Sequence, residues 1–274
     1  MVSLNIRRFV AADIPMIVPV FMRGFHYKMN HERLLHWLLK LQPDGFWNAT
    51  MNGDVAGMVG AVRYGPAAYV SMMVVDPALQ RRGIGHALMK ALLADLDRHD
   101  CTTVMLESTE EGMPLYRSFG FEVQGTTHDV RRKCERDLVP AAAEPLPPRF
   151  DEIVALDAEA FGAPRRQMLQ QLLALPNSRA RHMDGGCIVA NEYVVGPWVA
   201  RSPEIAETLL DQALQLTSTK AGRLMVPSEN ESALDMLEQR GYEIVHTSPH
   251  MSRGPELPNR NRSLTYGQAS FALG

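Results

Sequence analysis

The chain has 274 residues, of which 46% are hydrophobic and 22% are charged, and its formal net charge is -3. This composition is typical of a folded, water-soluble protein of about two domains, and it excludes disordered, collagen-like and disulfide-framework proteins. A slightly negative chain has no general attraction for a phosphate backbone, so we expect no nucleic-acid partner. The three cysteines are widely separated and no apolar stretch is long enough to cross a bilayer, so we expect a cytoplasmic protein without membrane attachment.

Periodicity predicts the elements of the first half in an α+β order. Alternating apolar residues predict strands, and apolar residues at three- and four-residue spacing predict helices. The sequence gives, in order, a strand over 2–9, helices over 13–24 and 31–41, strands over 46–50, 55–64 and 69–75, a helix over 84–96, a strand over 103–107, a helix over 113–119 and an extended segment over 121–130. We therefore expect a mixed, largely antiparallel central sheet flanked by helices.

A proline- and alanine-rich stretch without amphipathic period lies over 139–149 and predicts a linker. It divides the chain into a first domain over 1–138 and a second domain over 150–274.

The strand over 69–75 runs into a loop that contains two glycines, and a helix begins at once. This loop and the start of the helix read Gln80-Arg81-Arg82-Gly83-Ile84-Gly85. Glycines allow close approach to the backbone, and a helix N-terminus attracts negative charge, so the loop is suited to hold a pyrophosphate. An arginine-rich turn that merely caps the helix is the alternative.

At this loop the sequence resembles the GCN5-related N-acetyltransferase (GNAT) family, whose acetyl-CoA signature is a strand, a Gln/Arg-x-x-Gly-x-Gly/Ala loop and a helix. Gln80, Gly83 and Gly85 occupy those positions, and Tyr116 before the pair Gly120-Phe121 matches the second family signature. The resemblance covers roughly residues 1 to 135. It implies an acetyltransferase that uses acetyl-CoA as cosubstrate and a small-molecule amine as acceptor, acting as a monomer or homodimer.

The resemblance also implies the residues of the site. The cofactor-binding residues expected from it are Met73, Val74, Val75, Gln80, Arg81, Arg82, Gly83, Ile84, Gly85 and Tyr116. Attack of an amine on the thioester ends with the departure of a thiolate, and the phenol of Tyr116 is suited to protonate it as general acid. A half-buried tyrosine with a structural hydroxyl is the alternative.

The residues that would handle the acceptor are less sharply defined. Glu107 ends a strand and is the preferred general base, with Glu110, Glu111 and Asp76 as alternatives, although any of these is also compatible with a loop charge. Phe25, Tyr27 and His31 are expected to line the acceptor pocket, or else to be ordinary helix residues. No set of side chains has the spacing of a metal site.

The second half repeats the first with weaker motifs. Gly241-Tyr242 follows Gly120-Phe121 after 121 positions, but Leu237 stands at the position of Tyr116 and no glycine precedes the helix after Val199-Ala200. The chain is thus similar to tandem GNAT proteins, and we expect a degenerate second domain and a single active site in the first.

The second half is then expected to pack on the first and to wall part of its acceptor pocket. His250, Arg253 and the tail over 266–273 are candidates for this, although a final strand that completes the sheet also fits the tail. A catalytically idle CoA-binding or protein-interaction module remains the alternative function.

Overall fold

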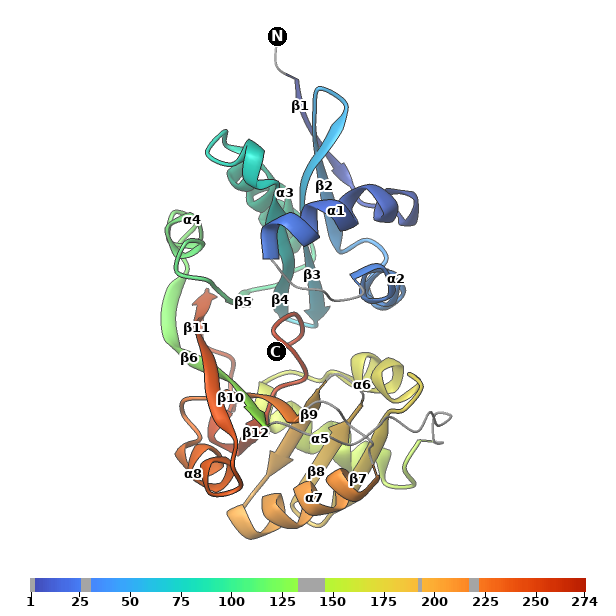
Figure 1. Ribbon diagram of the computed structural model, residues 1–274, viewed down its shortest axis with the longest axis vertical. Helices are drawn as coiled ribbons and strands as arrows, with labels where there is room; N and C mark the ends of the chain where they lie inside the picture. Colours follow the sequence, from blue (N-terminus) through green and yellow to red (C-terminus); the bar gives the residue numbers. More distant parts are fainter. Residues whose placement is uncertain (1–2, 26–30, 133–145, 192–193, 217–221) are drawn as a thin grey trace.

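The computed structural model describes residues 3–25, 31–132, 146–191, 194–216 and 222–274 (Figure 1). The first half contains β1 (Leu4–Arg8), α1 (Ile14–Phe25), α2 (His31–Leu41), β2 (Phe46–Met51), β3 (Asp54–Tyr64), β4 (Ala67–Val75), α3 (Ile84–Arg98), β5 (Thr103–Glu107), α4 (Met113–Arg117) and β6 (Glu122–Arg132). Every element predicted for this half is present. None of the described helices has the length and apolar character needed to span a membrane.

The described second half repeats this order of elements from α1 onward and adds β12 at the end. It contains α5 (Phe150–Phe161), α6 (Arg166–Leu173), β7 (Arg179–Met183), β8 (Gly186–Ala190), β9 (Val195–Ala200), α7 (Pro203–Leu216), β10 (Gly222–Pro227), α8 (Glu231–Gln239), β11 (Glu243–Arg253) and β12 (Thr265–Gly267). The turns after α4 and α8 match in detail. Gly120 and Gly241 have φ angles of 81° and 78°, values that glycine adopts without strain. The internal repeat is therefore confirmed.

Side chains of β4 alternate between two cores. Ala67 and Tyr69 pack in the core that contains the apolar faces of α1 and α2, whereas Ala68 and Val70 pack with Leu88 and Leu92 of α3. Alternation of this kind follows from the two-residue period of a strand. The helices α1 and α2 therefore cover one face of the first sheet, and α3 covers the other.

The two halves exchange strands. The larger sheet has the order β1-β2-β3-β4-β5-β11-β6-β10, so β11 of the second half lies between β5 and β6 of the first. The last long strand of the first half, β6, lies in turn between β11 and β10, and all these pairings are antiparallel. Figure 1 shows this pair of strands as the bridge on one side of the molecule. Neither half completes its sheet by itself, which the sequence did not predict.

The smaller sheet has the order β12-β9-β8-β7 and belongs to the second half alone. Its strand β12 pairs with β9 in antiparallel fashion, with Thr265 opposite Val199. The backbone N–H of Gln268, just beyond β12, donates to the carbonyl of Met225 in β10 at 2.8 Å. The segment 265–268 therefore lies between β9 and β10. The tail was expected either to wall the acceptor pocket or to form a final strand. The structure shows a short strand over residues 265–267 that adds to the smaller sheet.

Candidate functional site

The strands β4 and β5 separate part-way along their length. Their parallel pairing extends only from Ala67–Thr103 to Tyr69–Met105, although β4 continues to Val75. A bulge bends β4 beyond this point, and its Met72 has a φ angle of 55°, which a side chain rarely adopts. The edge of β4 that faces β5 is thus left without a strand partner among the described residues. Peptide groups on such an edge can bond an extended ligand.

The glycine loop lies at the end of this open edge. Gly83 is the N-cap of α3 with a φ angle of 81°, and Arg81 and Arg82 are exposed beside it. A Cβ atom added to Gly85 would come within 3.2 Å of the Met73 side chain and 3.3 Å of the Leu115 side chain. The structure therefore brings β4, the start of α3 and α4 together around the loop, as a site for an anionic, extended ligand requires.

Tyr116 is buried in α4, and its ring meets Phe121 edge-on at 6.0 Å between centroids. Burial raises the pKa of its phenol, which is therefore protonated at neutral pH. Its hydroxyl has no hydrogen-bond partner within the described ranges of the chain. The proton is thus available to a ligand, although the role of general acid stays a prediction.

Glu107 is the centre of a buried polar cluster between the two halves. Its Oε1 accepts hydrogen bonds from Tyr69 at 2.8 Å, Thr127 at 2.8 Å, His250 at 3.0 Å and Gln268 at 3.3 Å. Its Oε2 is buried and has no partner in the part of the chain that is described. Burial by itself raises the pKa of Glu107, but His250, Arg262 and the bond from Thr127 outweigh it, so the pKa lies below its ordinary value. The carboxylate is ionised, with one oxygen held by four hydrogen bonds and the other buried without a partner among the described residues.

His250 enters this cluster from β11, where it stands opposite Glu107 of β5. The ring is fully buried, and its Nε2 lies 3.2 Å from Nη2 of Arg260. Because arginine can only donate, Nε2 must accept, and Nδ1 must carry the proton that is donated to Glu107. Burial also lowers the pKa of His250, so the ring is neutral at neutral pH. The exchanged strand therefore fixes the orientation of the Glu107 carboxylate.

Other predicted residues lie elsewhere. Glu110 and Glu111 are exposed in the loop before α4, and Asp76 forms an ion pair with Arg23 while its Oδ1 caps the turn at Ala78. Phe25 stacks on Phe21 at 5.6 Å between centroids beside the core of the first half, which agrees with its alternative interpretation as a helix residue.

Tyr27 lies outside the described residues. His31 begins α2, but its side chain is outside the described part. Nothing in the structure therefore tests either residue as part of the acceptor pocket.

Four members of the Glu107 cluster were not predicted from sequence, namely Tyr69, Thr127, Arg260 and Arg262. Tyr69 and Thr127 belong to ordinary strand patterns, and the two arginines lie between β11 and β12, in a connection whose path depends on the packing of the second half. Gln268 lies in the tail over 266–273, which was expected to contribute only as a range. Within the described ranges, no group of three or more His, Cys, Asp and Glu side chains is arranged to hold a metal ion.

Sequence profiles of the acetyltransferase (GNAT) domain match both halves, over residues 17–133 and 153–267. The chain belongs to the GNAT family. It has two GNAT domains in tandem, and the match in the second half shows that this half keeps the family's overall pattern.

Full-length relatives share this tandem arrangement. The uncharacterized N-acetyltransferase YitH of Bacillus subtilis is 28% identical over 256 residues, which cover 86% of this chain and 87% of the relative. A crystal structure of a Pyrococcus horikoshii protein named as an acetyltransferase is 26% identical, covers 99% of this chain and 96% of its own, and superimposes with a TM-score of 0.86. A GNAT protein of Kribbella flavida, at 17% identity and a TM-score of 0.62, covers 94% of this chain and 72% of its own and shares the fold.

Proposed function

We propose that this GNAT protein transfers an acetyl group from acetyl-CoA to a primary amine of a small molecule, at one site in the first domain. The observation that carries the proposal is the open edge of β4, which leads directly into the glycine loop at Gly83 and lies beside Tyr116. An open strand edge, an anion-binding loop and a protonated phenol are the three parts that a thioester donor needs.

The donor would lie along the opening between β4 and β5. The amides at the start of α3 and the exposed Arg81 and Arg82 would hold its pyrophosphate, with Gln80, Ile84 and Gly85 completing the loop. The peptide groups of Met73, Val74 and Val75 would bond the pantetheine arm and polarise the thioester carbonyl. Apolar side chains in that stretch are compatible with this role because the backbone makes the contacts.

Acetyl transfer by direct attack requires three proton movements. The acceptor ammonium gives a proton to the unpartnered Oε2 of Glu107, and the neutral amine then attacks the thioester carbon to form a zwitterionic tetrahedral intermediate. When this intermediate collapses, the C–S bond breaks, the CoA thiolate takes the proton of Tyr116, and the positively charged nitrogen gives its second proton to the tyrosinate. The products are the acetylated amine and CoA, Tyr116 is restored directly, and Glu107 returns its proton to solvent.

The second domain would hold no second donor. The segment 265–268 lies between β9 and β10, the strands that correspond to β4 and β5, and it bonds to both of them. The helix α7 begins at Pro203 directly after Ser202, whose hydroxyl oxygen accepts from the N–H of Ile205 at 3.4 Å, and this connection contains no glycine. The backbone edge of β9 to which a pantetheine arm would bind is therefore already paired with the segment 265–268.

Calorimetric titration with acetyl-CoA tests the proposal. We expect one equivalent to bind to the wild-type protein and none to the Gly83→Trp variant. Gly241→Trp is the matched control, because Gly241 has a φ angle of 78° against 81° at Gly83 and neither has a heavy atom within 4 Å of an added Cβ.

Two equivalents would overturn the assignment of a single site, and absence of binding would overturn the whole proposal. If acetyl-CoA binds but no amine in a broad panel releases CoA, the protein is the idle CoA-binding module instead.

A further inference from the structure

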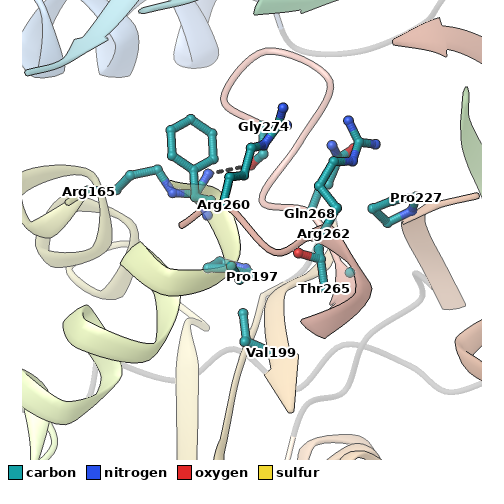
Figure 2. A pocket seen from close by; sticks show the side chains of 12 residues that line it. Arg165, Pro197, Val199, Pro227, Arg260, Arg262, Thr265, Gln268 and Gly274 are labelled. Atoms are coloured by element: carbon teal, nitrogen blue, oxygen red, sulfur yellow. Dashed lines mark hydrogen bonds between the residues drawn. The ribbon is translucent and has the colours of Figure 1, made fainter. Parts of the chain in front are cut away.

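A pocket lies in the second half, between α5, β9, β10 and the C-terminal segment over 260–274. Arg260, Arg262 and Gln268 line it on the side of this segment, and Arg165 lines it on the side of the helices. Figure 2 shows the side chains of Arg260 and Arg262 extending in the same direction from the C-terminal segment. The pocket is therefore rich in cationic groups, and the partners of each of them indicate what it binds.

Arg165 and Arg262 already have carboxylate partners. Arg165 donates two hydrogen bonds to Asp157, at 3.0 and 2.7 Å, and the Nε of Arg262 lies 3.1 Å from Glu229. Paired in this way, these two arginines add little net charge to the pocket.

Arg260 differs from both. Among the described residues it has no ion pair with a carboxylate side chain, and its guanidinium contacts the neutral ring of His250. Its Nε is buried without a hydrogen-bond partner, as are the Nε and Nη1 of Arg262. Burial, followed by the charge of Arg262, lowers the pKa of Arg260 to about 10, so the group is still charged at neutral pH. A half-buried guanidinium without a counter-ion has a desolvation cost, and an anionic group of a ligand would offset that cost.

The position of Arg260 relative to Glu107 identifies the ligand. One imidazole ring, that of His250, separates them, with contacts of 3.2 Å on one side and 3.0 Å on the other. The unpartnered Oε2 of Glu107 is suited to an ammonium group, and Arg260 is suited to a carboxylate. A small molecule with both groups would satisfy the two charges at once.

We propose that the acceptor is an amino acid, whose carboxylate is bound by Arg260 while its amine is held at Glu107. This inference rests on the acetyl transfer proposed above. The second domain then selects the substrate for the active site of the first, because Arg260 and His250 both belong to it. A diamine is disfavoured, because its second ammonium group would face the charge of Arg260.

The test compares the natural amino acids with their carboxamides as acceptors, by release of the CoA thiol. We expect kcat/KM to favour at least one free acid over its amide by about tenfold or more, the range of a single charge-assisted hydrogen bond. In Arg260→Gln the KM of that acid should rise roughly 10- to 100-fold, while the KM values of the amide and of acetyl-CoA stay unchanged.

Two further variants separate recognition from folding. Arg260→Lys keeps the charge and should recover part of the preference for the acid. Arg201→Gln is the control, because Arg201 forms an exposed ion pair with Glu159 in the same domain, and it should behave as wild type.

Equal or better turnover of the amides by the wild-type protein would overturn the inference and leave the acetyl transfer standing. A preference for amines that carry phosphate instead of carboxylate would likewise overturn it. If acetyl-CoA binds but no amine reacts, the proposed activity fails, and calorimetric titration of amino acids into the CoA-bound protein then decides. Binding that is lost in Arg260→Gln would support the carboxylate site, and no binding would overturn it.

Discussion

Replacement of Glu107 by Gln separates the chemical role of this side chain from its structural one. The variant keeps the shape of the residue and removes its charge. An amide oxygen in the place of Oε1 can still accept from Tyr69, Thr127, His250 and Gln268. The amide NH2 group takes the place of Oε2, which has no partner among the described residues. The hydrogen-bond pattern therefore survives, but the proton acceptor is lost.

The effect on stability is expected to be small because two changes oppose each other. A hydrogen bond to a charged group contributes about 1.5–3 kcal/mol and one between neutral groups about 0.5–1.5 kcal/mol, so four bonds weaken by about 4–6 kcal/mol together. The desolvation cost of a buried carboxylate, several kcal/mol in effective terms, is removed at the same time. We expect the free energy of unfolding to change by less than about 2 kcal/mol, whereas loss of a general base lowers kcat by about 10²- to 10⁴-fold.

Three measurements test this on one preparation: kcat/KM for the best acceptor, the urea midpoint of unfolding and the affinity for acetyl-CoA. Glu110→Gln is the matched control because Glu110 is exposed in the next loop. If kcat of Glu107→Gln falls by less than about threefold, the decrease is far smaller than the loss of a general base produces, and the catalytic role is refuted. Loss of folding would show that the cluster is primarily structural.

Three further outcomes are expected. Tyr116→Phe should lower kcat by about 10²-fold or more and leave acetyl-CoA affinity and thermal unfolding nearly unchanged, because the hydroxyl has no hydrogen-bond partner among described residues and the ring contact with Phe121 remains; an unchanged kcat would assign the acid elsewhere. Asp157→Ala should lower the free energy of unfolding by about 3–5 kcal/mol in urea titration, since it leaves the buried Arg165 without its carboxylate; a change below about 1 kcal/mol would contradict this. Burial alone raises the pKa of Asp129, but its bonds from Arg131 and Arg223 outweigh this and leave the pKa below its ordinary value. Its stabilising contribution should therefore be complete above the unfolded pKa and disappear as the pH falls between about 5 and 2, and Asp129→Asn should remove that part of the pH dependence in urea titrations; an unaltered pH profile would count against it.

The first half was predictable because its signals are local. The strand, the loop from Gln80 to Gly85 and the amphipathic helix that follows are consecutive in sequence, and the periods of two and 3.6 residues define their ends. Gly83 and Gly120 needed only the rule that glycine accepts positive φ angles.

The strand exchange could not be predicted in this way. Periodicity predicts that β6 and β11 are strands. It does not predict their neighbours in the sheet, because the alternating pattern of each strand is compatible with more than one partner. Glu107 was predicted as a site residue from its place at the end of a strand. Its partner His250 is 143 positions away, and only the register of β5 with β11 places the two side chains together.

The strand exchange also affects how the chain matures on the ribosome. His250 of β11 is 143 positions beyond Glu107, so at about 5–20 residues per second it is made roughly 7 to 30 s later. During that interval β5 and β6 lack the strand that will separate them, and their exposed edges can pair with a neighbouring nascent chain. Dense polysomes should therefore favour intertwined dimers of this protein, in which β11 of one copy completes the sheet of the other.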